Sequence, residues 1–249
     1  MKIFIIASNE LRRLFCSPLA WIILAIVQFT LAVFFYVYLS QYLENQASFI
    51  NQGLTKVVIT GLMHTAGTLF LLVTPFLTMR IFSDEMRNGT MKLLLSSPIS
   101  VSELVLGKFT GVVAFMFCMV LMIGLMPASL YFGTELDTGQ FISGMFGLLC
   151  LAASFVSIGL FISTLTQFPA AAAASTYFVI LMFWIVHIAA NTDNQLLSSI
   201  FNYLSVLRHY NQLVEGLFST VDVVYFIILV STFTMLSIWR IDSMRSYHW

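Results

Sequence analysis

The stretch from Leu14 to Leu43 reads LFCSPLAWIILAIVQFTLAVFFYVYLSQYL and carries no charged residue. About 20 apolar residues in a helix cross a bilayer core of about 30 Å. The stretch is apolar on every face, unlike the alternating strands of about 10 residues in a membrane barrel. It is too long for the apolar part of a cleavable signal and lacks a clear small-residue cleavage site, so we expect it to be retained. The sequence predicts a spanning helix at about 18–40 and excludes a soluble globular fold.

Four more uncharged stretches follow along the chain. They extend over 57–79, 109–134, 138–192 and 223–239. The third of them is long enough for two spans and a turn, and the last is short but sufficient for one span. We therefore predict an all-α polytopic membrane protein with six transmembrane helices. The spans are expected at about 18–40, 57–79, 107–132, 142–165, 170–190 and 222–239.

The composition agrees with a membrane protein. The chain is 59% hydrophobic and 9% charged, whereas a soluble domain has about 45–50% apolar and about 25% charged residues. A net charge of zero leaves no basic field that would attract nucleic acid. No repeat or second domain is visible, so residues 1–249 are predicted to form one transmembrane domain. Three cysteines without CxxC spacing, Cys16, Cys118 and Cys150, are predicted to be buried, inert thiols.

Basic residues are distributed unevenly between the two sides of the predicted bundle. With the N-terminus inside, the cytoplasmic side holds nine of them: Lys2, Arg12, Arg13, Arg80, Arg87, Lys92, Lys108, Arg240 and Arg245. The outer side holds two, Lys56 and Arg208. Because cytoplasmic loops of membrane proteins carry the excess of Lys and Arg, both termini are predicted to be cytoplasmic.

Residues 1–16 are expected to form a helix of their own. Apolar residues such as Ile6 and Leu14 alternate with polar ones such as Glu10 at roughly helical spacing. This pattern is typical of an amphipathic helix lying in the membrane interface. Ser17 and Pro18 suit the cap and the first position of a helix, so Pro18 is predicted to open the first span.

The stretch 80–108, RIFSDEMRNGTMKLLLSSPISVSELVLGK, is the largest segment on the predicted cytoplasmic side. Gly89 indicates a turn or helix stop. Thr90 can cap a very short helix that carries the leucine run, and Pro98 ends that helix. We expect this short helix to lie across the membrane face rather than through it.

The end of the same segment carries the signals of a helix start. Ser100-x-x-Glu103 is a capping-box pattern that would open the helix of the third span. Gly107 and Gly111 follow with small-xxx-small spacing, which allows another helix to approach closely.

The segment 191–221, on the predicted outer side, is not a polar loop. Its apolar residues recur at three- and four-residue steps and form one stripe: Leu196, Leu197, Ile200, Phe201, Leu204 and Leu207. The opposite face carries Asn202, Arg208 and His209. Because about 30 residues cannot hold two further spans with their loops, we predict a re-entrant or interfacial helical element before the sixth span.

Several common chemical sites are absent from the sequence. No P-loop, HExxH or GxSxG motif is present, so no ATP, metal or catalytic site is predicted in this chain. The predicted spans contain no Asp, Glu, Lys or Arg away from their ends, and intramembrane charges usually mark ion or proton paths. His64 and His187 lie inside or near a span, where packed, hydrogen-bonded histidines are the simpler interpretation. A transporter of this kind needs an outside source of energy.

The 80–108 segment resembles the permease subunits of type-2 ABC exporters, most closely those of the gliding-motility type. That family shows an acidic residue, Gly-Thr, a leucine pair, Ser/Thr-x-Pro and a later Gly-Lys in the cytoplasmic loop after span 2. The matching positions here are Glu85, Gly89, Thr90, Leu93, Leu94, Ser97, Pro98, Gly107 and Lys108. The stretch 10–18 and the outer element before span 6 also look like the family.

The resemblance implies how the chain would work. The short helix would be a coupling helix that docks in a groove of a separate ABC ATPase subunit, with its leucines as the buried anchor. The charged residues beside it would contact the rim of that groove: Asp84, Glu85, Arg87 and Lys92. Two ATPase copies would bind ATP and magnesium, so this chain would be no enzyme and would hold no cofactor.

The resemblance also implies an assembly. Two permease subunits, as a homodimer or with a related partner, would form the pathway, lined by spans 1 and 2 and the end of span 5. The location would be the bacterial inner (cytoplasmic) membrane, in contact with lipid. The family leaves room for a large extracytoplasmic subunit.

Three alternatives stay open at this point. Residues 80–108 could be a solvated loop with a stray apolar helix. The chain could be a non-transport scaffold or a mechanosignalling subunit that uses the same type of ATPase. It could also be a secondary transporter, which would require a proton-dependent role for His64 or His187.

Overall fold

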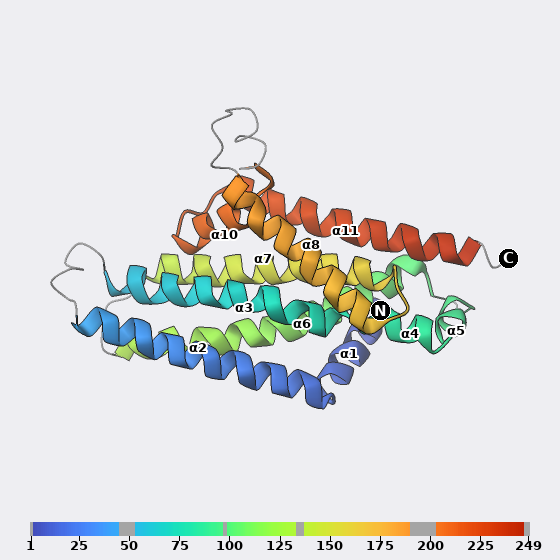
Figure 1. The fold of residues 1–249 in the computed structure, drawn as a ribbon, viewed down its shortest axis with the longest axis horizontal. Helices are drawn as coiled ribbons and strands as arrows, with labels where there is room; N and C mark the ends of the chain where they lie inside the picture. The colour runs from blue at the N-terminus through green and yellow to red at the C-terminus, as the bar shows by residue number, and fades with distance from the viewer. Residues whose placement is uncertain (1, 45–52, 97–98, 133–136, 190–202, 247–249) are drawn as a thin grey trace.

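The structure is a computed structural model that describes residues 2–44, 53–96, 99–132, 137–189 and 203–246. Every regular element in these ranges is helical (Figure 1). The long helices are α2 (Pro18–Glu44), α3 (Thr60–Thr78), α6 (Val101–Ala128), α7 (Thr138–Ser163), α8 (Pro169–Ala189) and α11 (Thr220–Ser246). The shorter elements are α1 (Lys2–Phe15), α4 (Ser83–Arg87), α5 (Met91–Ser96), α10 (Val206–Val214), the π-helical turn η1 (Thr55–Ile59) and the 3-10 turn η2 (Ser129–Phe132).

Six helices in the described ranges are long and apolar enough to cross a membrane, which confirms the predicted six-span fold. Successive spans run in opposite directions, and α1, α4, α5 and the C-terminal end of α11 lie at one end of the bundle (Figure 1). We call this the predicted cytoplasmic end and the other the predicted outer end. The helix α11 continues to Ser246, beyond the predicted end near residue 239, because no Gly or Pro follows Arg240 to stop it.

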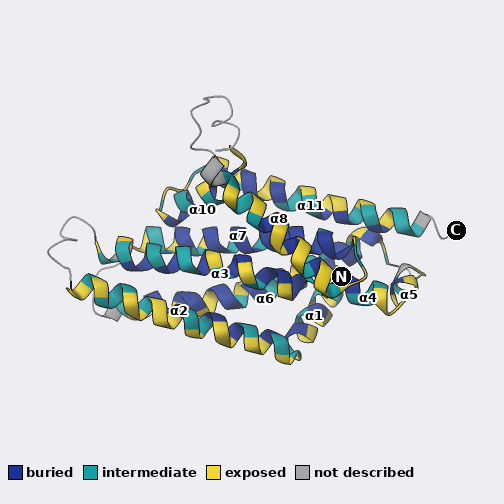
Figure 2. Ribbon diagram, in the orientation of Figure 1, coloured by how far each residue is buried: buried dark blue, intermediate teal, exposed yellow. Residues whose placement is uncertain are grey.

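The helix α7 is the centre of the bundle, surrounded by α3, α6, α8, α10 and α11. In its most apolar window 67% of the residues are buried, against 17% in α2 and in α8 (Figure 2). Gly159 allows close packing, because a Cβ there would lie 2.2 Å from Oγ1 of Thr78 on α3. The hydroxyls of Ser154, Ser157 and Ser163 donate to carbonyls of the preceding turn at 2.7–2.9 Å, so these buried polar groups are satisfied.

The outward faces of α2 and α8 carry large apolar side chains. Exposed examples are Trp21, Phe29 and Tyr36 on α2 and Phe178 and Met182 on α8. Faces of this kind contact lipid or another helix-bearing subunit in a bilayer. These two helices are the least buried of the six spans.

The cysteines differ from the prediction of three buried thiols. Cys118 and Cys150 are half-buried in α6 and α7, but Cys16 is exposed. Cys16 lies in the break between α1 and α2, where neither helix covers it.

The predicted outer element is described only from residue 203 onward, so Leu196, Leu197, Ile200, Phe201 and Asn202 lie outside the described residues. Its helix α10 packs on α7 and α11. Arg208 is exposed as expected, but the placement of His209 on the same polar face was wrong. His209 is buried, because a carboxylate on α11 provides it with a partner inside the bundle. Leu204 is exposed instead of buried, and Leu207 is half-buried.

Candidate coupling site

The chain turns sharply between α4 and α5. Gly89 has a φ of 71°, a left-handed conformation that glycine adopts without the strain of a Cβ. The hydroxyl of Thr90 donates to the carbonyl of Glu85 (3.3 Å), across the turn. The carbonyl of Thr90 accepts from the backbone N–H groups of Leu93 and Leu94, both at 3.1 Å, at the start of α5. The break and the short helix expected from the sequence are both present.

Replacing Gly89 with alanine is expected to loosen α5. Gly89 has open space around it, so only its backbone angle conflicts with a side chain, at a cost of about 1 kcal/mol. We expect the α5 amides to exchange with deuterium about fivefold faster, measured by mass spectrometry. Gly53→Ala is the matched control, because Gly53 also has open surroundings but no positive φ. Equal α5 exchange in both variants would contradict the prediction.

The predicted capping box is confirmed at the start of α6. The backbone N–H of Glu103 donates to Oγ of Ser100 (3.2 Å), and the backbone N–H of Ser100 donates to Oε2 of Glu103 (3.0 Å). Two otherwise unpaired N–H groups are thereby satisfied, which fixes where the third span begins.

Lys108 ties the start of the third span to the coupling segment. Its side chain is buried in α6, and Nζ donates to the carbonyl of Ile81 (2.7 Å) and to the carboxylate of Glu85. The ammonium also lies 4.8 Å from the ring centroid of Phe82, within the range of a cation–π contact. A buried charge needs such partners, so Lys108 holds residues 81–85 against α6.

Ser83 provides a second attachment. Its buried hydroxyl donates to the carbonyl of Ser163, the last residue of α7, at 3.1 Å. Ile81 and Phe82 beside it are fully buried. Residues 81–85, which we call the anchored part, are therefore fixed to both α6 and α7.

The helix α5 extends away from the bundle beyond the anchored part (Figure 1). Arg87 and Lys92 are exposed, Leu94 is half-buried, and Leu93 is 72% exposed. A large exposed apolar side chain of this kind suits a binding groove of a partner. The segment therefore combines an anchored part, held by buried contacts, with an exposed apolar side chain at Leu93.

The N-terminal helix packs directly on the start of α6. A Cβ at Gly107 would lie 2.7 Å from Cβ of Ile6, and one at Gly111 would lie 2.8 Å from the carbonyl oxygen of Ala7. The small-xxx-small spacing predicted a close approach without identifying α1 as the partner. Glu10, buried at this contact, pairs with Arg13 at 2.7 Å. The position of α1 in the membrane interface stays a prediction.

The structure separates the predicted site residues into two groups. The first group makes contacts within the bundle: Glu85 pairs with Lys108, and Gly107 packs against α1. Those that lie exposed or half-exposed are Asp84, Arg87, Gly89, Thr90, Leu93 and Leu94. Pro18 opens α2 as predicted, whereas Ser97 and Pro98 lie outside the described residues. Ser83 was missed, because nothing in the sequence relates it to Ser163. The ATPase contacts assigned to these residues stay a prediction.

The sequence matches the model of a protein family over nearly its whole length. The sequence model described as "ABC-2 family transporter protein" matches residues 4–241. The match includes all of the coupling segment, α10 and most of α11. Among curated proteins, none matches the chain.

Proposed function

The chain belongs to the ABC-2 family of transporters, and on this basis we propose that it is the permease subunit of an exporter driven by a separate ATPase. It is a multi-pass membrane permease of an ABC transporter. We further propose two ATPase copies that bind ATP and magnesium, a second permease subunit and a bacterial inner-membrane location. A large extracytoplasmic subunit is an additional proposed partner.

The observation that carries the proposal is the contrast between the anchored part and α5. The anchored part is joined to α6 by Lys108 and to α7 by Ser83. A force on the exposed Leu93 would therefore reach both helices and, through the chain itself, α3. Rigid elements of this kind transmit a displacement instead of absorbing it. A solvated loop with a stray helix would need none of these buried contacts.

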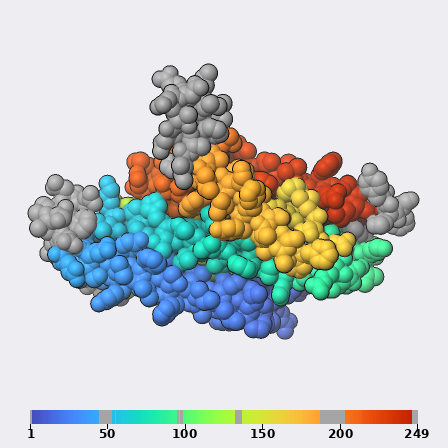
Figure 3. Space-filling model, viewed as in Figure 1, coloured from blue at the N-terminus to red at the C-terminus, as the bar shows by residue number. Residues whose placement is uncertain are grey.

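The proposed pathway lies on the face where α2, α3 and α8 reach the surface (Figure 3). An apolar groove of about 510 Å³ lies between parts of α3 and α8 there. It is lined by Leu72, Pro75, Phe76, Met79, Ala170, Ala173, Ala174 and Tyr177. The alanines at the start of α8 keep this groove open, because larger side chains would fill it. The low burial of α2 and α8 supports their assignment as the helices that face the second subunit.

The experiment that tests the function is reconstitution of the chain with its cognate ATPase in lipid vesicles. We expect Leu93→Asp to weaken ATPase binding by about 2 kcal/mol, roughly 30-fold in Kd, because it places a charge in an apolar contact. Binding is measured by titrating labelled ATPase onto the vesicles. Leu165→Asp is the matched control, since Leu165 is 51% exposed in the turn after α7, at the same end.

The outcomes separate the alternatives. Equal binding by the Leu93→Asp and Leu165→Asp proteins would contradict the role of α5. ATPase binding and hydrolysis without movement of any cargo would favour the scaffold or mechanosignalling alternative. Transport without an ATPase would favour a secondary transporter.

A further inference from the structure

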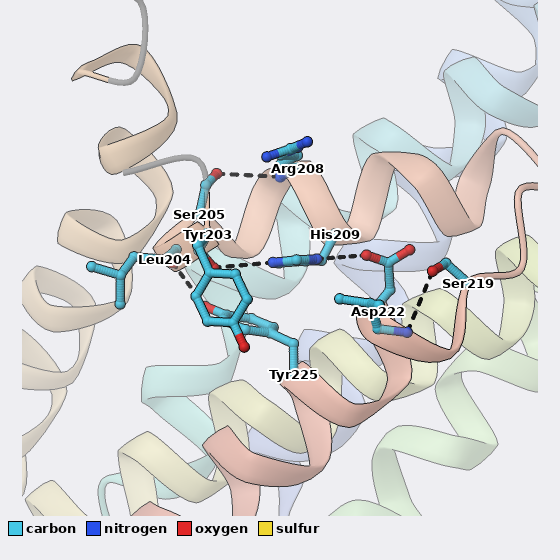
Figure 4. Close-up of polar contacts among 9 residues, drawn as sticks. Tyr203, Leu204, Ser205, Arg208, His209, Ser219, Asp222 and Tyr225 are labelled. Carbon is cyan, nitrogen blue, oxygen red and sulfur yellow. Dashed lines mark hydrogen bonds and ion pairs between the residues drawn. The ribbon is translucent and has the colours of Figure 1, made fainter. Parts of the chain in front are cut away.

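A second buried polar cluster lies where α10 meets α11, toward the predicted outer end (Figure 4). Nδ1 of His209 is 2.5 Å from Oδ1 of Asp222, and Nε2 of His209 is 3.1 Å from the carbonyl oxygen of Tyr203. Both His209 and Asp222 are buried. Each ring nitrogen thus lies beside an oxygen atom of another residue, one from a carboxylate and one from a backbone carbonyl. The geometry is that of a buried histidine–carboxylate pair.

Neighbouring side chains complete this cluster. The ring of Tyr225 stacks on the imidazole at 4.2 Å, and the Tyr225 hydroxyl donates to the carbonyl of Leu204 at 2.8 Å. A carboxylate can only accept here, so the Gln212 side-chain amide turns its nitrogen toward Asp222. In this orientation the nitrogen donates to the two oxygens of Asp222, at 2.9 and 3.0 Å. Asp222 also lies in the first turn of α11, where the helix dipole favours a negative charge.

The helix α10 is also attached to α3 and α7. The hydroxyl of Tyr210 donates to the carbonyl of Met63 on α3 at 2.6 Å, and its ring packs on Gly67, where a Cβ would lie 2.9 Å away. Leu213 fits against Gly147 of α7, and its carbonyl accepts from Ser143 at 2.7 Å. The helix α3 thus contacts α10 near one end and continues into the anchored part at the other.

We propose that the His209–Asp222 pair is a latch that holds α10 against α11 and keeps the predicted outer end closed between transport cycles. Its place in the cycle rests on the proposed function. Movement of the coupling segment would shift α3, and Tyr210 would carry that shift to α10. The latch gives two discrete states, because a partly separated pair would leave buried polar groups without their hydrogen-bond partners, which is unfavourable.

The latch is tested by the accessibility of a cysteine placed beneath α10. Leu213 is fully buried against α7. The cysteine introduced by Leu213→Cys, in a chain without Cys16, Cys118 and Cys150, therefore becomes accessible only when α10 separates from α7. A membrane-impermeant maleimide is added to the outside of vesicles that hold the full chain without nucleotide. We expect Asp222→Asn and His209→Asn each to raise the labelling rate at least tenfold. The double variant should label no faster than the faster single variant, because each change breaks the same contact.

Two controls make the result specific. Arg208→Gln removes a positive charge from the exposed side of the same helix and should leave labelling unchanged. A cysteine at Val112, fully buried in α6, should stay protected in every variant. Three outcomes would each overturn the latch. They are unchanged labelling in the single variants, an effect in the double variant equal to the product of the single effects, and labelling of the cysteine at position 112.

A further arm distinguishes the latch from the proposed function. With ATPase and nucleotide present, labelling at position 213 should rise in the otherwise unchanged protein, and Tyr210→Phe should abolish that rise. If nucleotide has no effect while the Asp222 and His209 variants still label faster, the latch stands and the ATPase-driven function fails.

Discussion

Replacing Lys108 with methionine is expected to uncouple ATP hydrolysis from transport and to lower the thermal stability of the chain. The substitution keeps most of the side-chain volume but removes the donor to Ile81 and the partner of Glu85. Breaking a buried pair costs about 3–5 kcal/mol, and we expect roughly 3 kcal/mol because the Glu85 side chain is 17% exposed. The anchored part would then move without moving α6.

Lys56→Met is the matched control for this prediction, because it removes the same charge from an exposed position in η1, outside the coupling segment. The measurements are the melting temperature in detergent and the number of substrate molecules moved per ATP in vesicles. Adding Glu85→Leu to Lys108→Met should recover part of the lost stability, since no unpaired charge remains, but should not recover coupling. Equal behaviour of the Lys108 and Lys56 variants would show that the buried contact does not transmit force.

Replacing Gly159 with alanine is expected to disrupt the packing of α3 on α7. The new Cβ would lie 2.2 Å from Oγ1 and 2.7 Å from Cβ of Thr78, which is itself fully buried. Thr78 cannot turn away freely, because its hydroxyl donates to the carbonyl of Thr74 at 2.9 Å. Overpacking of this severity costs about 3 kcal/mol, so the melting temperature should fall by roughly 6–12 °C.

Gly144→Ala on the same helix provides the comparison. Its Cβ would meet nothing closer than 3.5 Å, which is ordinary contact. Because alanine has a higher helix propensity than glycine, the melting temperature of Gly144→Ala should be unchanged or slightly higher. A similar loss of stability in both variants would indicate that any substitution in α7 is harmful, and would contradict a specific effect of the contact with α3.

The features that the sequence predicted correctly depend on local patterns. Uncharged runs predicted the six spans, the capping box predicted where α6 begins, and Gly89 predicted the break before α5. Each of these signals is contained in a few neighbouring residues or in one helix length. The expectation of a short helix before Pro98 came from the same kind of signal, and its role as a coupling helix came from the family resemblance.

The contacts between distant segments could not be predicted in this way. Lys108 was noted only as part of a motif, because nothing local shows that it reaches Ile81. His209 was placed on an exposed face, because a stripe pattern treats every histidine as polar. Its burial depends on Asp222, thirteen positions later, which had been regarded only as the boundary of the last span.

The contact of α1 with Gly107 and Gly111 has a consequence for how the chain is made. A ribosome produces α1 before α6, so the binding surface for α1 appears only after the two spans between them, α2 and α3, have been made. Until then the apolar side of α1, including Ile6, has only the membrane surface to cover it. The helix α1 thus reaches its final place later than its position in the chain suggests, and a bulky group attached to α1 would interfere with biogenesis at that step.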